Sequence, residues 1–420
     1  MSINNMGRGI SALALVAGSA TIALAALLAA AAPAFAEVAV SANDGKVRMV
    51  DGVVQSIKDG RDSITLIDMA ANPPKVLGEI EAPASVVGPP LSVAIAPNET
   101  IALVTSSQKL DPADPAKFVP DNRMSVIDLG GDSNTIVGRV KAATGLGKAE
   151  LRKPMTVIAT LQAGAGAAGV SINPAGTLAL VANREEGTVS VFTIAGKVVT
   201  AAGKIDFGNP KSAPDAIAFT PDGKTALVTR DGDHKISVLS IDGVKVEDTK
   251  RTMTAGVRPY GIDIAKGGLV AVVANIGTSS GDNDTMSLID LKSTPSRVVS
   301  TVTVGQTPEG IKLSPDGRLV AINLINGTNL AAGKPGAKTK GVVQVWSITG
   351  TEMKKVAEAP TGGWCQGLAW NKRATTLLVQ CMVEEEIMIF KLAGVTARSL
   401  DKVGSIKTKG GPAGIRTSEK

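Results

Sequence analysis

Few residues of this 420-residue sequence can act as acid, base or nucleophile at neutral pH. Serine and cysteine nucleophiles need an imidazole that accepts their proton, and the only histidine is His234. It ends the short polar turn Asp231-Gly-Asp-His. Equivalent turns carry Glu186-Gly and Asn283-Asp, so a short polar residue is what this turn requires. We interpret His234 as a turn residue, with proton transfer as the alternative.

Candidate oxygen ligands for a metal ion also lie in turns. Asp231 and Asp233 could serve Ca²⁺, as could residues 282–284, but Asp and Asn are ordinary turn residues. The sequence has no Cys or His cluster with zinc spacing and no Cys-x-x-Cys-His motif for haem. The Gly-rich residues 163–169 lack the Lys-Ser/Thr end of a phosphate loop. We expect no metal and no cofactor, with a calcium turn as the alternative.

Polar and aromatic residues gather at one end of a repeated strand pattern. If the repeats close into a ring, these side chains line one mouth of its central channel. The candidates are Asp215, Arg230, Arg258, Tyr260, Glu309, Trp364 and Gln366, and the ends of the second strands add Arg184, Asn275 and Asn323. Tyr260 is the only tyrosine of a chain with 2% aromatic residues.

This set of side chains suits a small ligand or a peptide. Arginine beside glutamate and tyrosine can also hold a carboxylate or a sugar acid through charge-assisted hydrogen bonds. The alternative is that Tyr260 and Trp364 merely fill the channel.

The two cysteines, Cys365 and Cys381, are expected on paired strands. Cys365 opens a first strand, Cys381 ends the second, and the turn at residues 371–374 lies midway between them. Directly opposed Cβ atoms in a hairpin lie ~4.5–5.5 Å apart, near the range of a disulfide. We therefore predict a structural disulfide between Cys365 and Cys381.

The elements that position these residues are short strands in a repeated order. Residues 213–241 contain three strands, separated by the turn Pro221-Asp-Gly and by residues 231–234. Proline presets φ in such a turn, and glycine accepts the positive φ that closes the hairpin. Seven copies of the third strand recur at intervals of 44 to 65 residues, with equivalent positions at Asp68, Asp128, Thr193, Ser240, Asp290, Ser347 and Lys391. This spacing is typical of propeller blades.

First strands open with a Pro-x-Gly-Ile signature, as at residues 259–262 and 308–311. The last copy, residues 412–415, has no second strand after it, whereas a second strand begins near Val38. The two ends therefore complete one blade and leave no exposed seam. We predict an all-β seven-bladed propeller of four-stranded antiparallel blades over residues 37–420, closed by the C-terminal strand. Fourth strands are expected, for example, at residues 76–81, 135–140, 297–304 and 396–406.

The repeats resemble the YVTN-type seven-bladed propellers, a group that includes bacterial lactonase-like and surface-layer propellers. The resemblance rests on Thr-Pro-Asp-Gly-Lys-Thr-Ala-Leu-Val-Thr at 220–229, Ser-Pro-Asp-Gly at 314–317 and the Val-Ser-Val-Ile-Asp-Leu series, and it covers roughly residues 37–420. Tyrosine, which the family often carries in the repeat, is nearly absent here. The resemblance implies the fold but no particular activity, because function resides in sites added to such scaffolds.

Three loops between second and third strands are long, at residues 44–62, 108–122 and 327–341. In blades of alternating strands these loops share a face with the connections between blades. We expect this face to carry the binding surface.

The first 36 residues differ from the rest. Arg8 precedes an apolar stretch that ends at Pro33, and Ala34-Phe-Ala fits a signal-peptidase site. We expect a bacterial-type signal peptide at residues 1–36, cleaved before Glu37, and a periplasmic or secreted protein with no membrane attachment. An uncleaved membrane anchor is the alternative. The net charge of +6 is scattered, and with few aromatic residues it favours no nucleic-acid partner.

These observations favour an exported, monomeric and non-catalytic propeller. It would present one loop face to a protein partner or to a small acidic or sugar-type ligand. The main alternative, which the resemblance permits, is a lactonase-like hydrolase that uses Asp215, Arg258 and Glu309 to activate water. A second alternative, from fold analogy, is an accessory propeller subunit of a periplasmic quinoprotein dehydrogenase.

Overall fold

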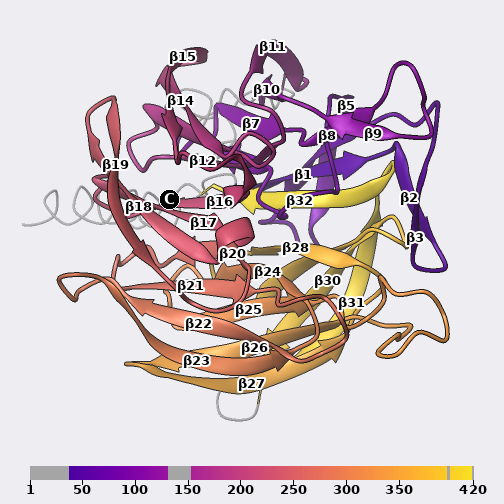
Figure 1. The fold of residues 1–420 in the computed structure, drawn as a ribbon. Helices are drawn as coiled ribbons and strands as arrows, with labels where there is room; N and C mark the ends of the chain where they lie inside the picture. The colour runs from indigo at the N-terminus through magenta and orange to yellow at the C-terminus, as the bar shows by residue number, and fades with distance from the viewer. Residues whose placement is uncertain (1–36, 131–152, 395–397, 419–420) are drawn as a thin grey trace, which may run out of the picture. The chain divides into compact units, whose positions relative to one another are not determined.

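A computed structural model describes residues 37–130, 153–394 and 398–418. This part of the chain consists of strands, two short 3₁₀ helices, η1 (Pro210–Ser212) and η2 (Asp231–Asp233), and turns (Figure 1). None of its helices has the length and apolar character needed to cross a membrane. The predicted signal peptide lies outside the described residues.

The strands form seven four-stranded sheets. From the innermost strand outward, the first contains β32 (Gly411–Thr417), β1 (Val38–Asp44), β4 (Ser63–Asp68) and β5 (Lys75–Glu81); the second β6 (Val93–Ile95), β7 (Ile101–Thr105), β10 (Arg123–Asp128) and β11 (Thr156–Gln162). The third contains β12 (Ala167–Ile172), β13 (Leu178–Asn183), β14 (Thr188–Ala195) and β15 (Val198–Asp206); the fourth β16 (Pro214–Phe219), β17 (Thr225–Arg230), β18 (Lys235–Asp242) and β19 (Lys245–Met253). The fifth contains β20 (Pro259–Ile264), β21 (Val270–Asn275), β22 (Asp284–Asp290) and β23 (Arg297–Gly305); the sixth β24 (Pro308–Leu313), β25 (Leu319–Leu324), β26 (Val342–Thr349) and β27 (Glu352–Pro360). The seventh contains β28 (Cys365–Trp370), β29 (Thr376–Cys381), β30 (Glu386–Ala393) and β31 (Ser399–Lys407).

These sheets are the blades of a closed seven-bladed propeller, which confirms the predicted fold. Each innermost strand packs against the innermost strands of the two neighbouring blades. The closing strand β32 pairs antiparallel with β1, for example Ile415 opposite Ser41, and Figure 1 shows the yellow strand beside the indigo one. The inner edge of β1 is therefore covered by a strand from the other end of the chain.

The second strands of the blades are buried on both faces because each blade lies between two others. All six residues of β13 (LALVAN) are buried, whereas the outermost strand β15 is mostly exposed. A strand covered on both sides needs a continuous apolar run rather than an alternating one. This explains why the Leu-Val-rich second strands stand out in the sequence.

Glycine in the Pro-x-Gly-Ile signature lets the innermost strands approach one another around the axis. A Cβ atom on Gly261 would collide with the carbonyl oxygen of Glu309 in the next blade, and one on Gly310 with that of Gln366. Glycine is thus a steric requirement at these two contacts, whereas the fourth blade has Ala216 at the equivalent position.

Two features depart from the expected strand list. Residues 135–140, expected as a fourth strand, lie outside the described residues, and the fourth strand of that blade is β11, further along the chain. Two of the long loops contain hairpins, β2 (Val47–Val50) with β3 (Val53–Ser56) and β8 (Gln108–Leu110) with β9 (Phe118–Pro120). We call these hairpins the arms.

Removal of β32 tests the ring closure. A chain that ends at Gly410 loses the inner partner of β1 and uncovers buried neighbours of Ile415, whose own burial contributes about 2–3 kcal/mol. We expect aggregation, or a melting temperature lower by more than about 10 °C, in gel filtration and thermal unfolding. A chain that ends at Thr417 keeps the whole strand and should melt like the full chain. Equal melting of both truncated chains would contradict the closure.

Candidate functional site

One mouth of the channel is built from the second residues of four consecutive innermost strands. These residues are Asp215 of β16, Tyr260 of β20, Glu309 of β24 and Gln366 of β28, and all are less than 10% exposed. In each strand the pairing shifts register directly after the first residue. A bulge of this kind redirects a side chain out of the regular ladder. The structure therefore brings together these four of the seven predicted site residues, and a fifth, Arg258, joins them through Asp231.

Arg184, directly after β13, is the centre of an ion network at this mouth. Its guanidinium contacts a carboxylate oxygen of Asp215 and lies 3.0 Å from Oδ2 of Asp231. The same Asp231 oxygen is 2.9 Å from Nη2 of Arg258. Arg184 also lies 5.8 Å from the ring centroid of Tyr260, a cation–π distance. Two arginines and two aspartates from adjacent blades thus neutralise one another.

Burial opposes the ionisation of the acids in this mouth. It raises the pKa of Asp215, although the contact with the Arg184 guanidinium acts in the opposite direction and favours the carboxylate. It raises the pKa of Glu309 to about 7, and the hydrogen bond from Nε2 of Gln366, 2.6 Å away, only partly offsets this. The pKa of Tyr260 is also raised, mainly by burial. Because Asp215 is in contact with Arg184, Glu309 is the mouth carboxyl better suited to proton transfer near neutrality.

Arg230 and His234 are close to this network in sequence but have separate contacts. Arg230 contacts Asp233 in its own loop, donates to Ser237 and lies 4.5 Å from the ring centroid of Phe207. His234 follows η2 with φ of 58° and accepts a hydrogen bond at Nδ1 from the backbone of Arg258. His234 thus has the turn geometry that the sequence predicts, while Arg230 packs between its loop and the end of β15.

Trp364 lies in an apolar cluster where the arms meet the blades. Its buried members are Val47, Val86, Met382 and Ala413, with Met49, Val87, Phe118 and Trp364 packed against them. Met49 belongs to the first arm and Phe118 to the second. Trp364 therefore packs in a cluster to which both arms contribute, a position that could not be predicted without the hairpins.

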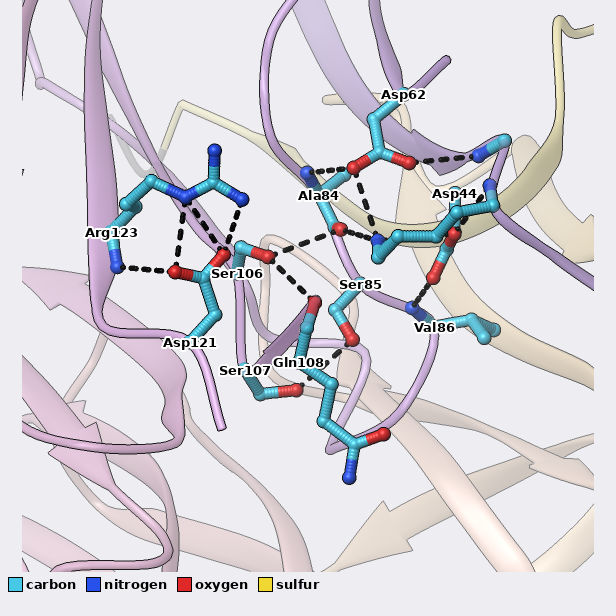
Figure 2. A network of polar contacts seen from close by, with 12 residues as sticks. Asp44, Asp62, Ala84, Ser85, Val86, Ser106, Ser107, Gln108, Asp121 and Arg123 are labelled. Atoms are coloured by element: carbon cyan, nitrogen blue, oxygen red, sulfur yellow. Dashed lines mark hydrogen bonds and ion pairs between the residues drawn. The ribbon is translucent and has the colours of Figure 1, made fainter. Parts of the chain in front are cut away.

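A polar network fixes the bases of the arms (Figure 2). Lys46, which precedes β2, lies 3.1 Å from Asp44 and 3.0 Å from Asp62 and also donates to the carbonyl of Ala84. Ser106 donates to the same carbonyl at 3.2 Å. Burial raises the pKa of Asp44 to about 6. One buried lysine thus ties the first arm to the connection between the first two blades.

The two cysteines form a disulfide between β28 and β29, where they are directly opposed. Within the described residues, the only grouping of three metal-ligand side chains consists of these cysteines and Glu384. Disulfide sulfurs are not thiolates and do not bind Zn²⁺ as such. Of the turn carboxylates considered for Ca²⁺, Asp284 accepts from the backbone of Thr307 and Asp233 contacts Arg230.

Comparisons with solved structures identify many proteins with this fold. A Bacteroides fragilis protein with the provisional name 6-phosphogluconolactonase matches with a TM-score of 0.65 and 16% identity, covering 92% of this chain and 99% of its own. The periplasmic gluconolactonase of Pseudomonas aeruginosa matches with a TM-score of 0.60 and 13% identity, covering 90% and 99%. A chain of Kuenenia stuttgartiensis hydrazine synthase matches with a TM-score of 0.57 and 16% identity, covering 80% and 91%.

At these identities the likeness shows the fold and not the activity. No protein-family model matches the chain, and no curated protein matches it.

The raised pKa of Glu309 predicts a pH-dependent stability. Because its pKa is about 7 in the folded chain and about 4.5 when unfolded, its contribution is fully present below pH 4.5 and is lost as the pH rises through 7. Between pH 5 and 8 the wild-type chain should lose roughly 2–3 kcal/mol more unfolding free energy than Glu309→Gln, since the amide does not titrate. Urea unfolding at both pH values measures this difference. The exposed control Glu247→Gln should follow the wild type, and a Glu309→Gln chain that does the same would refute the assignment.

Proposed function

We propose that the chain is an exported, monomeric, non-catalytic propeller of the YVTN type that binds a partner protein through the face that carries the arms. The observation that carries this proposal is the pairing of the mouth. Arg184, Arg258, Asp215 and Asp231 form ion pairs with one another, and Gln366 donates a hydrogen bond to Glu309. Side chains paired in this way are less available to a substrate than unpaired ones, which supports a non-catalytic mouth.

The arms supply apolar surface on the same face. Val50, Val53 and Val54 of the first arm are between 39% and 55% exposed, and Val383, in the adjoining loop beside Gly363 and the Trp364 cluster, is 44% exposed. The tip at Gly52 approaches the backbone of Leu330 in the third long loop, so the arm reaches from the first blade to the sixth. Exposed apolar side chains on a pinned hairpin are typical of protein-binding surfaces.

The arm valines can be tested directly. Val53→Ser with Val54→Ser removes apolar area without touching the blades. After chemical cross-linking in extract of the source organism, the wild-type chain should retain a stoichiometric partner that this double variant loses. Val198→Ser with Val244→Ser is the matched control and should retain it, because Val198 begins β15 and Val244 lies in the turn before β19, and both are exposed. Identical capture by both double variants would contradict the proposed face.

A lactonase-like hydrolase is the second candidate. It is favoured by the pKa of Glu309 and by the names of two structural neighbours, a 6-phosphogluconolactonase and a gluconolactonase. In this candidate Glu309 would deprotonate water beside Arg258. The hydrazine synthase match is the corresponding support for an accessory subunit of a redox enzyme.

Lactone hydrolysis separates the two candidates. Under the non-catalytic proposal, purified protein opens gluconolactone or muconolactone no faster than buffer alone. The rate is measured from the protons released at constant pH. The Glu309→Gln chain should give the same background rate. Hydrolysis above background that disappears in Glu309→Gln would establish the hydrolase and end the non-catalytic proposal.

A further inference from the structure

Each blade ends in an outermost strand that pairs on one side only. In the described part of the chain these strands are β5, β11, β15, β19, β23, β27 and β31, and each pairs with the third strand of its own blade. The free edge presents backbone N–H and C=O groups to which a strand of another chain can add. Proteins commonly protect such edges with charged side chains, lysine above all. The charge content of the seven strands therefore shows which edges are protected.

Six of the seven outermost strands carry charged residues. The strands β5, β15, β19, β27 and β31 have between two and five each. The strand β23 has one, Arg297 at its first residue. The strand β11, whose sequence is Thr-Val-Ile-Ala-Thr-Leu-Gln, has none. Its edge is thus the one in the seven blades that no charge of its own protects.

The composition of β11 favours the addition of another strand. It contains valine, isoleucine, leucine and two threonines, and neither proline nor glycine. Uncharged segments of six or seven residues with high β-propensity pair readily with other strands. Val157 is 39% exposed and Ile158 is 42% exposed, whereas the valines of β23 are buried or half-buried. The strand β11 therefore combines an uncharged edge with apolar side chains in solvent.

The first blade adds apolar surface beside β11. Met155, directly before β11, lies against Gly78 of β5, where an added Cβ atom would be 3.9 Å from its Cε atom. Val76 and Leu77 precede this glycine and are 47% and 45% exposed. A segment that adds to β11 therefore lies close to apolar side chains of two blades, an arrangement typical of interaction sites.

The shape and the charge of this edge indicate its occupant. The pairing of β11 with β10 shifts register so that Ile158 is an extra residue, and such a bulge bends and twists a strand. A flexible segment can follow a bent edge more easily than the fixed edge of a second ring. A charged residue placed against β11 would lose hydration without gaining a counter-charge from this strand. The edge therefore suits an extended, uncharged segment.

We propose that β11 is a docking edge that takes an extended, uncharged segment of a partner protein as a fifth strand of the second blade. Backbone hydrogen bonds to β11 supply affinity, and apolar side chains of the segment pack beside Val157 and Ile158. The edge belongs to a strand at the outer end of a blade, whereas the arms lie in loops. The proposal therefore does not depend on the partner proposed for the arm face.

Two blocked, fluorescently labelled peptides test the edge by fluorescence anisotropy with the purified chain. The first has the uncharged, strand-forming sequence of β11 itself. The second has proline in place of the alanine at its fourth position, which removes a backbone donor and disfavours pairing. We expect a Kd of about 10–100 μM for the first and binding at least about tenfold weaker for the second. Equal affinity of the two peptides, or no binding of the first, would overturn the proposal.

Two variants of the chain locate the binding. Thr160→Lys places a charge at an exposed position of β11 and should weaken binding of the first peptide at least about tenfold. The matched control Thr252→Lys, at an exposed position of β19, should bind like the wild type. Thermal melting checks that both variants are folded. Hydrogen exchange should show that the peptide protects amides of β11 in the wild-type chain.

Two results would refute the docking edge. Unchanged binding by a folded Thr160→Lys chain, or protection of amides away from β11, would place the peptide elsewhere. A wild-type chain that elutes as a dimer in gel filtration, with a monomeric Thr160→Lys chain, would assign the edge to a second copy instead of a partner segment. Neither experiment depends on partner capture by the arms.

Discussion

The close approach of seven innermost strands around one axis is the constraint on which the rest of the structure depends. Glycines such as Gly261 and Gly310 leave no room for a side chain because the next blade's carbonyl lies against them. The ring can then close only if β32 supplies the seventh strand. Each innermost strand packs against two neighbours. A change at one of these contacts therefore also disturbs the packing of the neighbouring blades.

This constraint separates the channel into two ends with different chemistry. At the arm end, a bulge directs the second residue of each strand toward its neighbours, where Asp215 and Arg184 can meet. At the other end, the strands diverge into turns, and the side chains leave a cavity. Ion pairs between Arg184, Arg258, Asp215 and Asp231 lie at the first end, and Asp263 pairs with Lys312 and Arg416 at the second.

The repeat makes the fold and the mouth positions predictable, because register transfers from one blade to the next. The opposed position of Cys365 and Cys381 follows from the same register. The repeat also places Arg184 at the end of a second strand, but its pairing with Asp231 depends on a loop that leaves the repeat. The arms could not be predicted because they lie in loops outside the repeat, and a hairpin inserted in a loop has no counterpart in the other blades. Lys312 and Arg416 stand at a position of the innermost strands where four other blades have alanine or serine. This departure from the repeat is the only feature of the sequence that draws attention to the second end of the channel.

The two ends of the channel differ in their polar contacts and need not share a function. A catalytic mouth needs a group that changes protonation in contact with substrate, and Glu309, the carboxyl best suited to this, is held by Gln366 at 9% exposure. Binding of a ligand needs only a concave surface whose polarity suits it, and no group that titrates. The cavity lined by Trp370 is a surface of this kind. A ring with a pinned arm on one face and an open cavity on the other can therefore couple its two ends only if a change at one end shifts the innermost strands. Contacts such as those of Gly261 and Gly310 hold these strands closely together, so the packing favours two ends that act independently.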